Sequence, residues 1–372
     1  MNASPRYIAG QILADLKRKM VFVAGPRQVG KTTLARNLPD ASEGYLNWDV
    51  DEDRERILRR ELPPADLWTF DEIHKYRGWR NLLKGLYDGR QEGQRILVTG
   101  SGRLELFGFG GDSLQGRYNL LRLHPFSVAE AGIGNNEGLK QLLHLGGFPE
   151  PFLGGGEVEA RRWSRQYRAR LLDEDVASLT NIRDLGRLEE TMLRLPDLVG
   201  SPLSVNALRE HLRVAHRTVA SWLDTLERLY VIFRLPPFGA ARIRAVKQER
   251  KHYHFDWSLV TDPGARFENL VACHLLKWVH YLQDTEGRDL ELRFFRDVDG
   301  REVDFVVVDR REPILLVECK LRDRDMDRGL RYLKARFPAA QAHQIALSGQ
   351  RDYVTPDGIR AMPALDFLRT LV

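Results

Sequence analysis

Residues 20–38 read MVFVAGPRQVGKTTLARNL, and the fold of the first part of the chain can be inferred from them. The octapeptide from Gly25 to Thr32 fits the phosphate-loop pattern G-x-x-x-x-G-K-[ST]. The apolar run before it predicts a strand, and residues 33–38 predict the helix that follows. Strand, loop and helix in this order let successive backbone N–H groups cradle phosphate oxygens. We therefore expect a nucleotide-binding α/β domain.

The expected ligand of this loop is ATP with Mg²⁺. In the phosphate-loop mechanism, Lys31 reaches the β- and γ-phosphates, and the hydroxyl of Thr32 holds Mg²⁺. The alternative is a chance glycine-rich turn, which the flanking strand and helix disfavour. The residues expected to contact the nucleotide are Gly25, Pro26, Arg27, Gln28, Val29, Gly30, Lys31, Thr32 and Thr33.

A second apolar run, Leu67 to Phe70, ends in the acids Asp71 and Glu72. A strand that ends beside the phosphate loop places Asp71 to hold a Mg²⁺-bound water and Glu72 to polarise the attacking water. Taken alone, an apolar run ending in two acids is also a common strand-to-loop transition. A further predicted β–α unit separates this run from Lys31. This spacing favours the interpretation that Asp71 binds the cofactor and Glu72 is catalytic.

The next predicted strand runs from Arg95 to Ser101 and ends in small polar residues. A hydroxyl at that place can touch the γ-phosphate and respond to its loss. Either Ser101 or Thr99 can supply it, and we place Ser101 among the expected catalytic residues. The alternative is that both are simple turn residues.

The composition describes a globular chain of 372 residues, with 43% hydrophobic and 29% charged residues. No segment approaches the roughly 18 apolar residues that span a bilayer, and no signal peptide is evident, so we expect a cytoplasmic protein without a membrane partner. Cys273 and Cys319 are too few for a disulfide framework, which predicts buried, reduced thiols. A net charge of +5 and a pI near 9.2 mildly favour a polyanionic partner such as DNA.

Along nearly its whole length, the chain resembles the AAA+ ATPases. It is most similar to the bacterial and archaeal family that joins an AAA+ module to a C-terminal domain of unknown function. Besides the phosphate loop, the resemblance rests on FDEIHK (70–75), TGS (99–101), GR (116–117), LRLHPFSVAE (121–130) and GGFPE (146–150).

The resemblance implies that Arg117 acts on the nucleotide of a neighbouring subunit. In AAA+ assemblies, an arginine at the end of the helix before the last core strand has this role, and Arg117 occupies that position ahead of the apolar residues 118–126. A guanidinium supplied in trans neutralises charge on the transferred phosphoryl and makes hydrolysis depend on assembly. We therefore expect a homo-oligomer, a ring with a hexamer as one candidate. The alternative is a solvated or salt-bridged arginine.

The middle third predicts a winged helix. Residues 204–212 and 216–229 read as two amphipathic helices across a short turn, followed by the strand-like residues 230–235. The second helix offers Arg213, His216, Arg217 and Thr218 at its start, the end that meets DNA in such motifs. Winged helices also dock proteins, so both interpretations stay open.

The last third carries a second group of charged residues. Residues 301–308 and 314–320 predict a hairpin that brings Asp304 beside Glu318, and the period of two puts Lys320 on the same face as Glu318. Two carboxylates and a lysine suit a metal-dependent phosphodiesterase, with Glu268 on a preceding helix completing the site. This order is similar to the restriction-endonuclease-like superfamily with its PD-(D/E)xK core. The alternative is a DNA-binding scaffold that does not cut.

These motifs predict an α/β protein with three domains. We expect an AAA+ ATPase domain with a parallel sheet at 1–153, a helical linker with a winged helix at 154–240, and a restriction-endonuclease-like domain at 241–372. The favoured function is an ATPase that couples hydrolysis to DNA binding or remodelling. The alternative is a nucleotide-dependent switch that acts on a protein partner.

Overall fold

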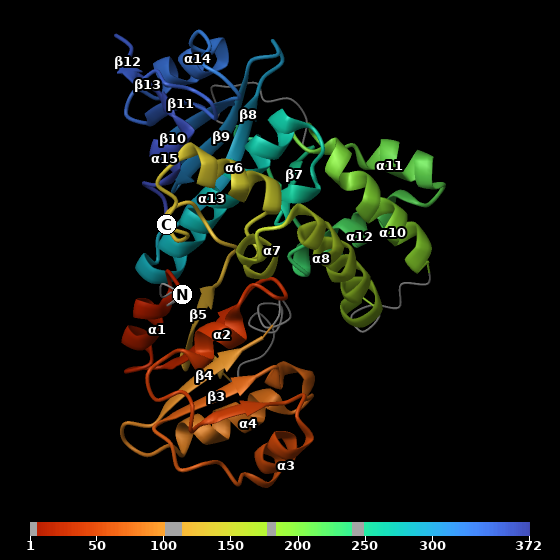
Figure 1. Ribbon diagram of the computed structural model, residues 1–372, viewed down its shortest axis with the longest axis vertical. Helices are drawn as coiled ribbons and strands as arrows, with labels where there is room; N and C mark the ends of the chain where they lie inside the picture. The colour runs from red at the N-terminus through yellow and green to blue at the C-terminus, as the bar shows by residue number, and fades with distance from the viewer. Residues whose placement is uncertain (1–5, 101–113, 177–183, 240–248) are drawn as a thin grey trace. The chain divides into compact units, whose positions relative to one another are not determined.

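The computed structural model describes residues 6–100, 114–176, 184–239 and 249–372. The chain divides into two compact units, one formed mainly by residues up to Pro125 and the other mainly by residues from Phe126 onward. The predicted domain boundaries near residues 153 and 240 stay predictions. Figure 1 shows the elements of both units.

The first unit is built on a five-stranded parallel sheet (Figure 1). Its strand order is β2-β3-β4-β1-β5, and all four neighbouring pairs are parallel. Every residue of β1 is buried, which explains why this strand is a continuous apolar run in the sequence. The predicted α/β fold with a parallel sheet is confirmed. The strands are β1 (Met20–Ala24), β2 (Tyr45–Asn47), β3 (Leu67–Asp71), β4 (Arg95–Thr99) and β5 (Tyr118–Arg122).

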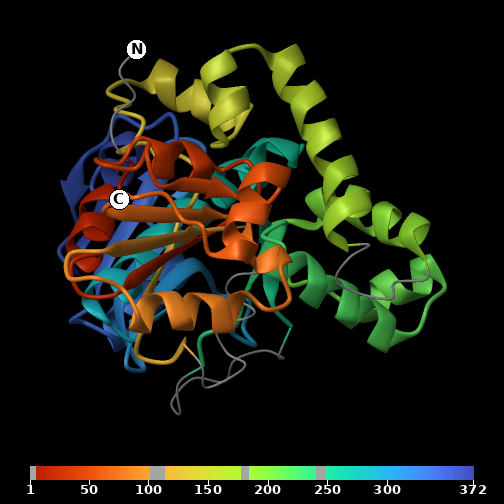
Figure 2. The same ribbon diagram turned by 90° about the horizontal axis from the view of Figure 1, so that it is seen from below.

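Helices connect these strands and cover the sheet. They are α1 (Ala9–Asp15), α2 (Lys31–Arg36), α3 (Asp51–Arg59) and α4 (Trp79–Asp88). Figure 2 shows α4 along one face of the sheet, where Trp79 and Leu83 share a core cluster with Phe22 and Phe70. Because the strands are parallel, the loops that follow them meet at one edge of the sheet.

The second unit begins with a helical region. Trp163 and Tyr167 stack on each other on one side of α8, and both pack against Phe148. Most of the arginines of α8 are exposed, so this helix turns a basic, solvated face outward. The helices are α6 (Asn136–Leu145), α7 (Pro149–Gly154), α8 (Glu157–Arg170), α10 (Leu185–Arg194), α11 (Val205–Leu212) and α12 (His216–Arg228).

Helices α11 and α12 are joined by a short turn that begins at Arg213, whose φ of 52° lies in the left-handed region. After α12, β6 (Ile232–Leu235) pairs antiparallel with β7 (Lys251–His254). A winged helix has this order of elements. The assignment stays a prediction, and residues 240–248 between the two strands lie outside the described residues.

The rest of the second unit is built on a mixed six-stranded sheet with the order β12-β13-β11-β10-β9-β8. The predicted hairpin is confirmed, because β9 and β10 are antiparallel neighbours with Phe305 opposite Val317. Strand β11 pairs in parallel with β10 and with β13. The strands are β8 (Leu290–Arg296), β9 (Glu302–Asp309), β10 (Glu312–Lys320), β11 (Gln341–Ala346), β12 (Tyr353–Val354) and β13 (Ile359–Pro363).

Three helices accompany this sheet: α13 (Pro263–Glu286), α14 (Arg328–Arg336) and α15 (Ala364–Leu368). The side chain of Asp262 caps α13 by accepting from the backbone N–H of Ala265. Leu330 of α14 shares a core cluster with Leu316 of β10. Within the described ranges, no helix is both long and apolar enough to cross a membrane.

Candidate nucleotide site and C-terminal acidic cleft

The phosphate loop follows the last residue of β1 and ends at the start of α2. Gly25 passes so close to the residue after β5 that a Cβ atom would lie 2.2 Å from the carbonyl oxygen of Leu123. Gly30 caps α2 with a φ of 97°, in the left-handed region. Both positions therefore require glycine, the first for close approach and the second for backbone conformation. This geometry fits a loop whose backbone wraps around phosphates.

Lys31 lies over this loop and is only 6% exposed. Its ammonium donates to the carbonyl oxygens of Gly25 at 3.1 Å and Pro26 at 2.6 Å. Thr32 and Thr33 follow it in the first turn of α2, and both are exposed. A buried ammonium above a phosphate loop is placed to neutralise phosphate charge.

Asp71, at the end of β3, accepts hydrogen bonds from three hydroxyl groups. Its Oδ2 atom accepts from Thr32 at 2.7 Å and from Tyr45 at 2.6 Å, and its Oδ1 atom accepts from Thr99 at 2.5 Å. In the phosphate-loop site, the sequence predicts that Thr32 holds Mg²⁺ and that Asp71 holds a Mg²⁺-bound water, and the structure brings these two side chains into contact. Their oxygen atoms fit the ligand preference of Mg²⁺.

Tyr45 is a site residue that the sequence analysis missed. It lies on β2, and only the pairing of β2 with β3 places its hydroxyl on Asp71. Burial, together with the hydrogen bond to Asp71, raises the pKa of Tyr45 above its ordinary value, so its hydroxyl remains a donor. The sequence offers no signal for this role, because a tyrosine in a short strand is most often a packing residue.

Glu72 follows Asp71 and adopts a φ of 58°, which a non-glycine residue rarely does. Its backbone N–H donates to the carbonyl oxygen of Thr99 at 2.9 Å. Its carboxylate lies 3.6 Å from the ammonium of Lys75. Burial raises the pKa of Glu72 above its ordinary value, although Lys31 and Lys75 act in the opposite direction. A carboxylate with a raised pKa is a stronger base toward a water molecule.

Two further predicted residues have different outcomes. Ser101 lies outside the described residues, whereas the other sensor candidate, Thr99, contacts Asp71. Arg117 immediately precedes β5 and forms an ion pair with Asp88 at 2.8 Å. Hydrogen bonding from Arg117 lowers the pKa of Asp88 below its ordinary value. The catalytic roles predicted for Ser101 and Arg117 stay predictions.

The N-terminal segment supports the phosphate loop in a way that the sequence did not indicate. Arg6 donates to the carbonyl oxygen of Val29 at 2.6 Å and to that of His124 at 2.5 Å. Tyr7 donates to the carbonyl oxygen of Arg122 at 2.5 Å. Residues ahead of α1 therefore tie the loop to the chain that follows β5.

The second predicted site forms a cleft of about 740 Å³ in the second unit, lined by Glu268, Asp304, Glu318 and Lys320 among others. Lys320 donates to Glu318 at 2.7 Å, which confirms that the two share a face of β10. Asp304 accepts from the backbone N–H of Cys319 at 2.9 Å, and Glu318 accepts from that of Asp304 at 3.2 Å. The hairpin therefore holds both carboxylates by crossed hydrogen bonds.

Crowding of these acids affects their protonation. Burial, followed by the charges of Glu318 and Glu268, raises the pKa of Asp304 well above its ordinary value. Burial raises the pKa of Glu318 to about 7, against the opposing effect of Lys320. Buried carboxylates near one another favour any cation that can share their space.

That cation is a residue which the sequence analysis missed. Lys251, the first residue of β7, is 1% exposed, and its ammonium lies 3.1 Å from Glu268, 2.6 Å from Glu302 and 3.8 Å from Asp304. Burial acts to lower the pKa of Lys251, but the charges of these carboxylates outweigh it and raise the pKa above its ordinary value. The sequence of β7, Lys-His-Tyr-His, has no apolar run that would mark its lysine as buried, so the sequence did not indicate this role.

The structure thus brings Glu268, Asp304 and Glu318 to the lining of one cleft, and their role as metal ligands stays a prediction. Among the residues that the structure describes, no group of three or more His, Cys, Asp or Glu side chains is placed to hold a metal. The ammonium of Lys251 lies directly against two of the three predicted ligands.

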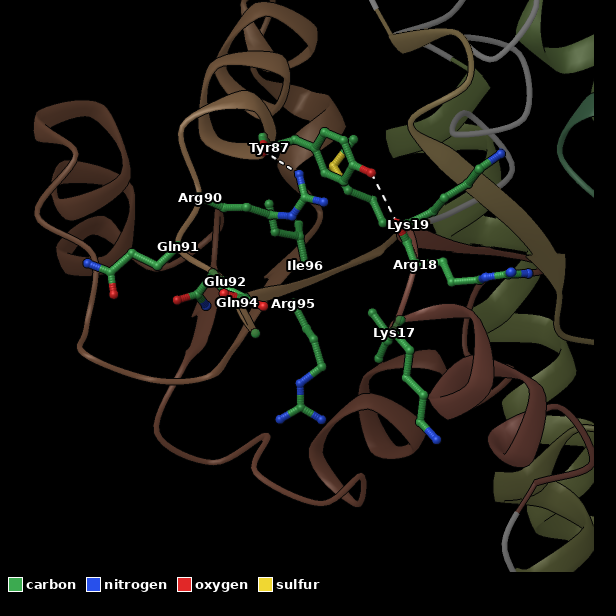
Figure 3. A pocket seen from close by; sticks show the side chains of 13 residues that line it. Lys17, Arg18, Lys19, Tyr87, Arg90, Gln91, Glu92, Gln94, Arg95 and Ile96 are labelled. Carbon is green, nitrogen blue, oxygen red and sulfur yellow. Dashed lines mark hydrogen bonds between the residues drawn. The ribbon is translucent and has the colours of Figure 1, made fainter.

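A basic cleft of about 660 Å³ lies at the opposite edge of the first sheet (Figure 3). It is lined by residues at the starts of β1 and β4, whereas the phosphate loop follows the end of β1. Arg90 stacks on the ring of Tyr87 at 3.6 Å, and the hydroxyl of Tyr87 donates to the carbonyl oxygen of Arg18 at 3.2 Å. The charged residues of the lining are Lys17, Arg18, Lys19, Arg90, Arg95 and Glu92.

Three family models match successive parts of the chain. An AAA domain matches residues 17–132, a Domain of unknown function (DUF8612) matches residues 136–262, and a Domain of unknown function (DUF4143) matches residues 263–367. An uncharacterized protein of Mycobacterium tuberculosis is 26% identical over 377 residues, covering 95% of this chain and 83% of the relative. An uncharacterized protein of Mycobacterium bovis matches with the same values.

Solved structures show more distant likenesses. The Walker-type ATPase of Pyrococcus abyssi is 16% identical, with 69% of this chain and 94% of that chain covered and a TM-score of 0.43. A RuvB variant of Thermotoga maritima is 19% identical, with 62% and 89% covered and a TM-score of 0.30. Likenesses at such TM-scores carry no conclusion about this chain. With the phosphate loop, the parallel sheet and the AAA family model in agreement, residues 17–132 of this chain are an AAA domain of the AAA+ ATPase family.

Proposed function

We propose that this chain binds ATP with Mg²⁺ at the phosphate loop, hydrolyses it, and couples hydrolysis to DNA contact. The observation that carries the ATPase part is the 2.7 Å hydrogen bond from Thr32 to Asp71. This contact brings the hydroxyl of Thr32 and the carboxylate of Asp71 together beside Lys31, and a hydroxyl, a carboxylate and a lysine are the groups that a Mg²⁺–nucleotide complex needs, which supports the proposal.

Each residue of the site has a distinct part in this proposal. Lys31 neutralises phosphate charge, while Thr32 and Asp71 would hold Mg²⁺, which would supply further positive charge against the phosphates. Tyr45 and Thr99 fix the orientation of the Asp71 carboxylate through their hydroxyl groups. Glu72 orients and polarises the attacking water, a role that its raised pKa favours.

Arg117 is proposed to act on the nucleotide of a second subunit. Residues 20–24 of β1 pair in register with residues 118–122 of β5, so Arg117 stands at the opposite end of the sheet from its own phosphate loop. Five residues of strand correspond to about 16 Å. A guanidinium at that distance serves a nucleotide only across a subunit interface, which supports an oligomer in which each site is shared by two chains.

Two exposed basic surfaces support DNA as the partner. Arg213, His216 and Arg217 are exposed around the start of α12, the end of a recognition helix that meets DNA. The basic cleft of the first unit has five basic residues and one acidic residue in its lining. Both surfaces suit contact with a phosphate backbone, which depends on positive charge more than on sequence readout.

Steady-state ATP turnover and DNA binding on one preparation test this proposal. We expect Mg²⁺-dependent turnover, and binding of duplex DNA whose log affinity falls linearly with log salt concentration. The double variants Arg213→Ala/Arg217→Ala and Lys17→Ala/Lys19→Ala each remove two cations. The magnitude of the slope of log affinity against log salt concentration should decrease by about 0.9 for each lost phosphate contact.

A variant on the solvated face of α8, Arg161→Ala/Arg165→Ala, removes the same charge elsewhere and serves as the control. If the control lowers the magnitude of this slope as much as the other two variants, DNA binding depends on the overall charge of the protein and not on either surface. ATP turnover with no salt-dependent DNA binding would instead favour the alternative, a nucleotide-dependent switch that acts on a protein partner.

A further inference from the structure

Lys251 is one of the most completely buried charged residues in the described part of the chain. Its three carboxylate neighbours come from two other elements, Glu268 from α13 and both Glu302 and Asp304 from β9. The ammonium is within hydrogen-bonding distance of Glu268 and Glu302, and Asp304 lies farther away, at ion-pair distance. Burying this charge is tolerable only because these partners compensate it.

The backbone of Lys251 is fixed by its strand pairing. Its backbone pairs with Leu235 of β6, and it also bridges to Pro202. Two residues along the same strand, Tyr253 donates to Glu268 at 2.6 Å, on the same oxygen atom that Lys251 contacts. Strand β7 therefore places both an ammonium and a hydroxyl against the carboxylate of Glu268 on α13.

The third acid of the cluster is compensated separately. Glu318 accepts from Lys320 at 2.7 Å, and Lys320 also lies 3.1 Å from Asp327. Each predicted metal ligand thus has a lysine partner that belongs to the protein. A divalent ion placed among these acids would lie within a few ångströms of the Lys251 ammonium, and the like charges would repel each other.

We propose that Lys251 takes the place of the divalent cation, so the acidic cleft of the second unit is neutralised by the protein itself and binds no metal. The cleft then lacks the ion that a metal-dependent phosphodiesterase needs to activate water. Glu268, Asp304 and Glu318 together with Lys251 form an internal ionic network that joins α13, β7 and the β9–β10 hairpin. This inference does not rest on the ATPase proposal.

A Mn²⁺ titration of the full chain tests the proposal, with free Mn²⁺ followed by electron paramagnetic resonance. All proteins carry Lys31→Ala and are freed of nucleotide and metal beforehand, which silences the phosphate loop. Lys251→Met keeps the length of the side chain and removes its charge. We expect no Mn²⁺ uptake by the parent and uptake of one Mn²⁺ per chain by Lys251→Met. Adding Asp304→Asn to Lys251→Met should abolish that uptake.

Lys277 provides a matched control, because it is also 1% exposed and is paired with Glu130 at 2.5 Å. Lys277→Met loses a buried lysine in the same unit but should gain no Mn²⁺ site. In thermal unfolding, Mn²⁺ should raise the melting temperature of Lys251→Met and leave those of the parent and Lys277→Met unchanged. If Lys251→Met does not fold, the charge-balanced variant Lys251→Met/Glu302→Gln replaces it.

Two results would overturn the proposal. The first is stoichiometric uptake of Mn²⁺ by the parent that Asp304→Asn removes, because the cluster would then hold a metal beside Lys251. The second is a folded Lys251→Met protein, or its charge-balanced form, that takes up no Mn²⁺. Neither result bears on ATP turnover, which is measured in protein with an intact Lys31.

Discussion

Arg117 and Asp88 form a two-pronged ion pair, with Nε 2.8 Å from Oδ1 and Nη2 3.2 Å from Oδ2. Asp88 is the last residue of α4, and Arg117 directly precedes β5. The side chains are 29% and 46% exposed, and an ion pair at such a surface contributes little to stability. The proposed role of Arg117 at the nucleotide of a neighbouring subunit therefore requires it to give up only a weak ion pair.

Replacing Arg117 by alanine should leave nucleotide affinity unchanged and lower ATP turnover by about 10³-fold or more, the effect of losing an arginine supplied in trans. Asp88→Ala breaks the same ion pair but keeps the guanidinium, so its turnover should stay near that of the parent. Equilibrium binding of a fluorescent ATP analogue and steady-state turnover measure the two effects.

Mixing Arg117→Ala with Lys31→Ala should restore part of the turnover, because each variant supplies what the other lacks across one interface. Co-assembly is checked by size-exclusion chromatography with light scattering. Absence of rescue in mixed assemblies would show that Arg117 does not act between subunits.

Lys31→Ala and Glu72→Gln should separate binding from hydrolysis. Lys31 neutralises phosphate charge in the bound state, so its loss should abolish both nucleotide binding and turnover. Glu72 acts mainly on the attacking water, so Glu72→Gln should retain bound ATP and hydrolyse it slowly. Single-turnover assays with radiolabelled ATP measure the chemical step directly, and a parental rate in Glu72→Gln would contradict the water-activating role.

Tyr45→Phe tests a contact that only the structure reveals. Loss of its hydroxyl removes one of three hydrogen bonds to Asp71, and loss of such a supporting contact lowers metal affinity or activity by about 10-fold or more. We expect a higher Mg²⁺ concentration for half-maximal turnover, with unchanged nucleotide affinity in the presence of EDTA. Tyr76→Phe, in the same unit and stacked on Trp48, is the control and should show no shift.

Acid should destabilise the second unit through His274. Its Nε2 atom accepts from the backbone N–H of Val128 at 2.9 Å, and its Nδ1 atom lies 2.8 Å from the carbonyl oxygen of Leu270, so the ring fits its site only when neutral. Burial lowers the pKa of His274 from 6.5 to about 3. Because the unfolded chain takes up the proton first, this contribution to stability is present above pH 6.5 and is lost as the pH falls toward 3.

Urea unfolding between pH 7 and pH 4 measures this effect. The free energy of unfolding should fall with pH in the parent protein and fall less steeply in His274→Gln. The exposed His216 is the control position. In His216→Gln, the free energy of unfolding should change with pH as steeply as in the parent protein. Equal slopes in the parent and His274→Gln would assign the acid sensitivity to other groups.

Much of both units could be predicted from local patterns in the sequence. The phosphate loop, the strand ending in Asp71 and the β9–β10 hairpin depend on residues close together in the chain, where apolar runs, glycines and alternation carry the information. The juxtaposition of Thr32 with Asp71 also follows from the motif, because parallel strands bring their carboxyl ends to one edge.

The phosphate-loop motif, the parallel sheet around it and the charged face of β10 all follow from short-range spacing in the sequence. Three contacts depend instead on the tertiary structure: Tyr45 donates to Asp71, Asp88 pairs with Arg117, and Lys251 lies against the acids of the second unit. Strand order and the packing of one element on another bring these partners together. Nothing in the sequence near one partner identifies the other. A buried cluster of acids needs positive charge nearby, because water no longer solvates the carboxylates in the folded interior. This need arises only on folding.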